Sequence, residues 1–221
     1  MALHPAIIIS HTMIQICIDF DGTITTRDTI VYVTEQFGAG EEYRTRIVND
    51  IKSGKISVFR GIRLELETVK ADWETVVATL RENVFLDQGF EEFVAWGKDE
   101  AHPMTILSSG MTPVVELYAG HLGIPIYAHK LTVSPDGWRF EVIEEHRKES
   151  VLESIRKKGP VVYIGDGTSD VAAIPYAELL FARRGQYLQA YCREEGIPCI
   201  PYSDFSEVKS RLIEWIEERD F

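Results

Sequence analysis

The chain has 221 residues, of which 45% are hydrophobic and 26% are charged. This composition is ordinary for a globular protein with a buried core, and the length fits one large domain or a domain with an insertion. The formal net charge is −12 at pH 7, whereas nucleic acids and anionic membranes bind basic surfaces. We therefore expect neither partner, and a phosphorylated ligand would need local positive charge or a metal ion.

No targeting or membrane-spanning segment is expected. The apolar run 6–9 has no basic leader, and no run approaches the roughly 18 apolar residues that a spanning helix needs. Cys17, Cys192 and Cys199 form no Cys-x-x-Cys motif, which argues against a disulfide framework or a structural zinc site. We expect buried thiols in a cytoplasmic protein, with a Cys192–Cys199 disulfide as the alternative. Residues 7–9 are expected to add a strand.

Apolar runs alternate with helix-start signals along most of the chain. Residues 14–20 form a short apolar run that ends in acidic residues, which is typical of a buried parallel strand. Thr112-Pro113 marks a helix start, and residues 131–133 and 138–142 flank a turn signal that predicts a hairpin. The pattern predicts an α/β fold with a Rossmann-like, mainly parallel sheet. Its further strands are expected at 104–107, 161–164, 179–182 and 199–200, with a last helix at 205–215.

Residues 30–88 interrupt this alternation. Their apolar residues repeat at helical spacing, for example Tyr43, Ile47 and Ile51. We expect a helical cap inserted into a catalytic core made of residues 1–29 and 89–221. The stretch 41–70 has more basic than acidic residues, in contrast to the chain as a whole.

Two acidic clusters follow predicted strands: Asp19-Phe20-Asp21-Gly22-Thr23 and the segment from Gly165 to Asp170. In open α/β sheets, ligands bind at the carboxyl ends of the strands, where these clusters would meet. Carboxylates held together repel one another unless a cation lies between them, and oxygen ligands suit Mg²⁺. The sequence fits neither a calcium-binding EF-hand loop nor a Walker phosphate loop. The two clusters therefore predict a catalytic metal site.

The first cluster resembles motif I of the haloacid dehalogenase-like hydrolases. The other three motifs of that family follow in order: Thr105-Ile106-Leu107-Ser108, then Lys148, then Gly165-Asp166-Gly167-Thr168-Ser169-Asp170. The resemblance extends over nearly the whole chain, and the helical segment between motifs I and II resembles the phosphoserine-phosphatase-like branch. It implies a phosphatase that acts on a small phosphorylated metabolite.

The resemblance also implies roles for the two carboxylates of motif I. Asp19 would be the nucleophile that forms an aspartyl-phosphate, and such covalent catalysis divides one difficult displacement into two easier steps. Asp21 would act as general acid and then as general base. Family members that dehalogenate lack an acid at the position of Asp21, so its presence favours phosphoryl transfer.

Further roles are implied at the other motifs. Ser108 would hydrogen-bond a phosphoryl oxygen, assisted by the backbone of Ser109 and Gly110. Lys148, preferred over its neighbour Arg147, would neutralise the nucleophile and the transferring group.

The implied cofactor is Mg²⁺. It would be held by Asp19, Asp166 and the backbone carbonyl of Asp21, and Asp170 would orient Lys148 or a bound water.

The substrate is left open by the sequence. Arg63 matches the cap arginine that binds the substrate carboxylate in phosphoserine phosphatases, although a surface pair with Glu67 is equally available. Asp28 stands where those enzymes have a glutamate for the amino group. The segments 181–183 and 201–205 instead resemble the methionine-salvage phosphatases, which act on 2-hydroxy-3-keto-5-methylthiopentenyl-1-phosphate. A phosphomutase and a non-catalytic binding protein are the alternatives, and cap closure about 26–29 and 86–89 is expected.

Overall fold

A computed structural model of the chain describes residues 13–219. The strand predicted at residues 7–9 lies outside this range. A seven-stranded sheet in the order β4-β3-β2-β1-β5-β6-β7 forms the centre of the molecule. All neighbouring strands are parallel except β3 and β4, which form the predicted antiparallel hairpin. The strands are β1 (Gln15–Ile18), β2 (Met104–Met111), β3 (Ile126–Thr132), β4 (Arg139–Glu141), β5 (Val161–Gly165), β6 (Leu179–Arg183) and β7 (Ile200–Tyr202).

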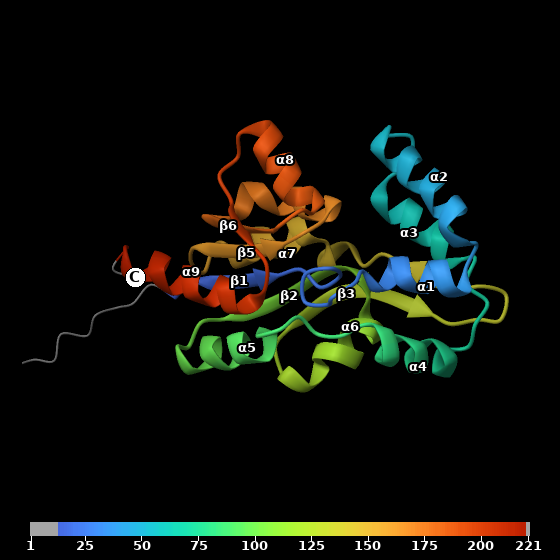
Figure 1. Cartoon of the computed structure of the whole chain (residues 1–221), viewed down its shortest axis with the longest axis horizontal. Coiled ribbons are helices and arrows are strands. Elements are labelled where there is room, and N and C mark those ends of the chain that lie inside the picture. The colour runs from blue at the N-terminus through green and yellow to red at the C-terminus, as the bar shows by residue number, and fades with distance from the viewer. Residues whose placement is uncertain (1–12, 220–221) are drawn as a thin grey trace, which may run out of the picture.

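Helices cover both faces of this sheet (Figure 1). In the core these are α5 (Phe90–Asp99), α6 (Thr112–Ala119), α7 (Lys148–Ile155), α8 (Tyr187–Glu195) and α9 (Phe205–Glu217), with 3₁₀ turns η1 (Gly120–Leu122), η2 (Glu144–His146) and η3 (Thr168–Tyr176). Between β1 and β2 lie α1 (Thr29–Phe37), α2 (Gly40–Lys52), α3 (Val58–Leu66) and α4 (Trp73–Asn83), which we call the cap helices. The fold confirms the predicted α/β class, and none of the described helices is long and apolar enough to cross a bilayer.

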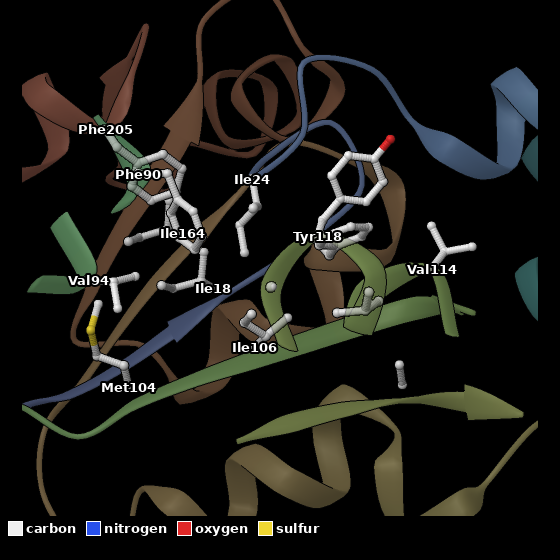
Figure 2. Packing of buried hydrophobic residues seen from close by; sticks show 14 of the residues in the cluster. Ile18, Ile24, Phe90, Val94, Met104, Ile106, Val114, Tyr118, Ile164 and Phe205 are labelled. Atoms are coloured by element: carbon white, nitrogen blue, oxygen red, sulfur yellow. The ribbon is translucent and has the colours of Figure 1, made fainter. Parts of the chain in front are cut away.

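The alternation of side chains along the central strands builds two apolar layers. Ile16 and Ile18 of β1 face the layer under α5, α6 and α9, whereas Cys17 faces the layer under α7 and α8. Figure 2 shows how Ile18, Ile106 and Ile164 from three adjacent strands pack with residues from the covering helices, among them Phe205. Burial on both faces explains why these strands appear in the sequence as continuous apolar runs.

Strand order decides where a site can form. The central strand β1 has β2 on one side and β5 on the other, so the strand order reverses there. At such a point the loops that follow adjacent strands diverge to opposite faces and leave a crevice. The acidic clusters after β1 and β5 and the Ser-Ser-Gly segment of β2 therefore meet at one edge of the sheet.

The two segments predicted to act as hinges lie side by side. Thr25 and Leu86 form an isolated antiparallel bridge, and Thr26 N donates a hydrogen bond to Phe85 O at 2.9 Å. The chain thus leaves and re-enters the core through one paired connection. The core and cap boundaries and the motion of the cap stay predictions.

Candidate active site

A sharp turn after β1 positions the first acidic cluster. Asp19 N donates to Ile164 O of β5 at 2.9 Å, which keeps Asp19 in the sheet ladder. The chain then turns back, and the N–H groups of Thr23 and Ile24 both donate to Phe20 O. Gly22 within the turn has a φ of 75°, and a Cβ at this position would lie 2.5 Å from Asp166 Oδ2. Only glycine lets the two acidic clusters approach this closely.

A buried lysine connects the two clusters. Lys148 Nζ, at the first turn of α7, donates to Asp19 Oδ1 at 2.6 Å, to Asp170 Oδ1 at 2.5 Å and to Ser169 Oγ at 3.0 Å. Lys148 and Asp19 are only 3% and 4% exposed. Although burial lowers the pKa of Lys148, the carboxylates of Asp170 and Asp19 raise it above its usual range. The ammonium group is therefore a fixed positive charge beside Asp19.

Asp170 is held on both of its oxygens. Oδ1 accepts from Lys148 Nζ and from Tyr163 OH at 2.6 Å, and Oδ2 accepts from the backbone N–H groups of Asp166 and Gly167 at 2.9 and 2.7 Å. This arrangement leaves little capacity for a direct metal bond. It fits the expectation that Asp170 orients Lys148.

The carboxylate oxygens at this edge of the sheet suit a hard divalent cation. One carboxylate oxygen from each of Asp19, Asp166 and Asp170 lies within 4.8 Å of the others. Burial and then the Asp19 carboxylate raise the pKa of Asp166 to about 9, and burial and then Asp170 raise that of Asp19 to about 7. These buried carboxylates repel one another, and a cation with oxygen ligands would remove that repulsion.

Asp21 is positioned by the start of α1. Its Oδ1 accepts from Thr29 N at 2.8 Å and from the Thr29 hydroxyl at 2.5 Å. Its Oδ2 lies beside Gly110, where a Cβ would come within 2.6 Å of that oxygen. Burial and then the neighbouring Asp28 carboxylate raise the pKa of Asp21 to about 8. A carboxyl group with such a pKa holds a proton near neutral pH and can donate it.

The serines of β2 are not equivalent. Ser109 and Gly110 line the cavity above Asp19 and Asp21, whereas Ser108 is 1% exposed and lies beneath that lining. Ser108 Oγ accepts from Gly110 N at 2.9 Å. Its hydroxyl hydrogen has no acceptor within residues 13–219, so it stays available to a ligand.

A cavity of about 230 Å³ joins this edge of the sheet to the cap helices. Asp28 lies in its wall, and its Oδ1 caps α1 by accepting from Val31 N at 2.9 Å. Its role in binding substrate stays a prediction. Sequence reasoning missed the other charged residues of the wall. These are Arg44 of α2 and Glu65 of α3.

Arg63 does not line the cavity, which corrects its predicted place beside the substrate. The side chain is exposed, and Nε donates to Phe140 O of β4 at 3.3 Å. Arg63 and Glu67 form no ion pair, so the predicted surface pair is absent as well. Arg63 follows Ile62 directly on α3, and this one-residue step rotates it away from the stripe that faces the cavity.

The three cysteines are free thiols. Cys192 is buried beside Cys199, and burial raises the pKa of the Cys192 thiol to about 11. The prediction of buried thiols is confirmed for Cys17 and Cys192, whereas Cys199 is half-buried. The predicted alternative, a Cys192–Cys199 disulfide, does not form.

The model of the haloacid dehalogenase-like hydrolase family matches residues 16–175, which include all four motifs. The chain belongs to this family. The predicted family is thereby confirmed.

Relatives within the family agree with a phosphatase. The chain is 28% identical to the polyol phosphate phosphatase PYP1 of Saccharomyces cerevisiae, over 88% of this chain and 90% of that one. It is 30% identical to the 2-hydroxy-3-keto-5-methylthiopentenyl-1-phosphate phosphatase of Geobacillus kaustophilus, over 88% and 93% of the two chains. The prediction that this haloacid dehalogenase-like enzyme is a phosphatase is confirmed.

A solved structure of a phosphoserine phosphatase, described as a phospho-aspartyl intermediate analogue, superposes with a TM-score of 0.72. The match covers 91% of this chain and 99% of that one at 23% identity. At this identity the likeness shows the shared fold.

Proposed function

We propose that this haloacid dehalogenase-like phosphatase is a Mg²⁺-dependent phosphomonoesterase that transfers the phosphoryl group of a small metabolite first to Asp19 and then to water. The main support is the buried Asp19 carboxylate at the end of β1, with Lys148 Nζ 2.6 Å from its Oδ1 and Asp166 beside it. A nucleophile fixed beside a cation suits a reaction in which charge moves onto phosphoryl oxygens.

In the first step, a carboxylate oxygen of Asp19 attacks phosphorus. The new O–P bond forms as the bond from phosphorus to the ester oxygen breaks. Asp21 gives its proton to the departing alkoxide. The bonds from Thr29 to Asp21 Oδ1 leave Oδ2 free for this transfer.

In the second step, the Asp21 carboxylate takes a proton from water, and the water oxygen attacks phosphorus. The bond between phosphorus and Asp19 breaks, which restores the carboxylate and releases inorganic phosphate. Lys148 balances negative charge in both steps. Ser108 would donate its hydroxyl hydrogen to a phosphoryl oxygen, assisted by the backbone of Ser109 and Gly110, which line the cavity. The Gly110 N–H donates to Ser108 Oγ and so orients that hydroxyl.

The residues that would hold Mg²⁺ are Asp19, Asp166 and the backbone carbonyl of Asp21, with Asp170 in support. When bound, the ion would neutralise phosphoryl charge and help to orient the phosphoryl group. The close approach that Gly22 permits between the two acidic clusters supports this assignment.

The test is phosphate release from a panel of metabolite monoesters, with and without Mg²⁺. We expect turnover that needs Mg²⁺ and that falls below roughly a hundredth in Asp19→Asn. The matched control is Asp99→Asn, which changes an exposed aspartate of α5. Wild-type turnover in Asp19→Asn would refute Asp19 as the nucleophile. Movement of the phosphoryl group within the substrate, without free phosphate, would indicate a phosphomutase.

A further inference from the structure

Glu65 is a buried acidic residue in an otherwise apolar stripe of α3. With Val58 and Ile62 it follows the spacing of one helix face, and all three line the cavity. Glu65 is only 7% exposed. A leucine or methionine would fill this position without any cost of burying a carboxyl group.

The Glu65 carboxyl has no hydrogen-bond or ion-pair partner among residues 13–219. Burial raises the pKa of Glu65 to about 7, although the nearby Arg44 opposes the rise. Buried polar groups normally have hydrogen-bond partners, and each exception needs an explanation. A ligand in the cavity would supply the missing partner.

The cap end of the cavity does not favour a second anionic group on the substrate. Arg44 is its only cation among the described lining residues, and Arg44 Nη1 lies 3.6 Å from Glu35 Oε1. Asp28 and Glu65 both line the same wall. A substrate carboxylate placed there would meet two carboxyl groups and an arginine that already has an anionic partner.

On the cap side the remaining wall is apolar and suits a carbon chain, whereas Thr168, Ser169 and Gln186 line the core side. A hydroxyl group can both donate and accept hydrogen bonds. A protonated carboxyl group can also do both, so the two groups are matched partners. An ammonium group only donates and would instead form a charge-assisted pair with an ionised carboxylate, a case that the phosphoethanolamine arm of the test separates. The wall residues that would contact carbon atoms are Ile30, Val48, Ile51, Val58 and Ile62.

From this geometry we propose that Glu65 is a specificity-determining residue that, together with Asp28, binds the hydroxyl groups of a phosphorylated polyol. The inference rests on the proposed function, because it places the phosphate of this substrate at Asp19. It assigns the selection of substrate to a cap carboxyl group, in place of the carboxylate clamp predicted at Arg63.

The test compares kcat/KM for four compounds. Sorbitol 6-phosphate is the polyol phosphate, phosphoserine adds a carboxylate, and phosphoethanolamine has an amine alone. Acetyl phosphate is the reference, since its leaving group has neither a hydroxyl nor an amine. Each compound is assayed with the wild type, Glu65→Leu and the control Glu67→Leu, which changes an exposed residue at the end of the same helix.

We expect the wild type to prefer sorbitol 6-phosphate over phosphoserine and phosphoethanolamine. Glu65→Leu should lower the ratio of kcat/KM for sorbitol 6-phosphate to that for acetyl phosphate by roughly 10- to 100-fold, mainly through KM. Glu67→Leu should leave the ratio unchanged. Unfolding temperatures of the two variants check that a changed ratio does not come from misfolding.

An unchanged ratio in Glu65→Leu would overturn the inference, and so would a wild-type preference for phosphoserine or phosphoethanolamine. Failure of the proposed function looks different. In that case the Asp19→Asn variant would still hydrolyse acetyl phosphate and the monoesters, or the wild type would hydrolyse none of the compounds.

Discussion

Replacing Lys148 with methionine should both destabilise the protein and inactivate it. The side chain of Lys148 is 3% exposed, and its ammonium group bonds to Asp19, Asp170 and Ser169. Methionine preserves much of the apolar volume but removes the only cation of the described residues 13–219 that pairs with Asp19 and Asp170. The variant therefore isolates the charge of Lys148 from its packing.

The expected magnitude follows from the cost of leaving a buried charge unpaired. Removing one partner of a buried ion pair typically costs about 3–5 kcal/mol. For a chain of this length, each kcal/mol lowers Tm by roughly 2–4 °C, so Lys148→Met should lower Tm by roughly 6–20 °C. Burial and then Asp170 already raise the pKa of Asp19 to about 7, and without Lys148 it should rise further above its unfolded value, so stability should fall as pH rises through that window. The loss should thus be greater at about pH 8 than at about pH 5.

Thermal unfolding at both pH values, with Lys157→Met as control, tests this reasoning. Lys157 is exposed just beyond the end of α7, so its replacement should leave Tm nearly unchanged. Added Mg²⁺ should raise the Tm of Lys148→Met more than that of the wild type, because the cluster without Lys148 is more negative. A shift in Tm below about 2 °C, or an equal shift at both pH values, would refute the electrostatic account.

Three further predictions concern the surroundings of the site. Gly110→Ala would place a Cβ 2.6 Å from Asp21 Oδ2 and should lower kcat roughly 100-fold in a phosphate-release assay; an unchanged kcat would contradict the placement of Asp21. Burial raises the pKa of Glu65 in the folded protein from 4.5 to about 7. Ionisation of Glu65 therefore lowers the stability of the folded protein as pH rises from about 4.5. Glu65→Gln should therefore lose less Tm between about pH 5 and pH 8 than the wild type, and an equal loss would be evidence against the raised pKa. Arg183→Ala removes the guanidinium that bonds to the buried Asp87 carboxylate and should cost about 3 kcal/mol in urea unfolding, whereas a change below about 0.5 kcal/mol would argue against that ion pair.

The sheet was predictable because burial on both faces leaves a strong signal. The segments 161–164 and 179–182 are apolar without interruption, and 14–20 is apolar apart from Gln15 and Asp19. Each corresponds to a strand of the structure. The strand predicted at 104–107 extends in the structure to Met111. Polar Ser108 and Ser109 hid that extension, because the apolar pattern ends where the functional residues begin.

The clustering of Asp19, Lys148 and Asp166 was predictable from motif order. Parallel strands bring their carboxyl ends to one edge of a sheet, so residues far apart in sequence meet there. The lengths of the loops between the strands do not change which edge of the sheet these residues reach. Lys148 follows no parallel strand, because it begins α7 after the β3–β4 hairpin. Its place beside Asp19, 129 positions earlier, was therefore implied by the family resemblance and not by the sheet.

The cap end of the cavity was not predictable in the same way. Helical spacing indicates which residues share a face, but not which face meets the core. Arg44 precedes Val48 and Ile51 at that spacing, and Glu65 follows Ile62. A charged residue in phase with an apolar stripe was the available signal for both. Arg63, which matched a family position, is out of phase with the stripe of α3.

Capture of a phosphorylated enzyme tests the central claim most directly. The wild type, mixed with substrate and Mg²⁺ and quenched in acid within one turnover, should gain the mass of one phosphoryl group on the peptide that contains Asp19. With acetyl phosphate, whose leaving group departs without a proton, the Asp21→Asn variant should accumulate more of this species, because only the second step then depends on Asp21. Turnover with no phosphorylated enzyme in either protein, or a phosphoryl group on another residue, would contradict the account.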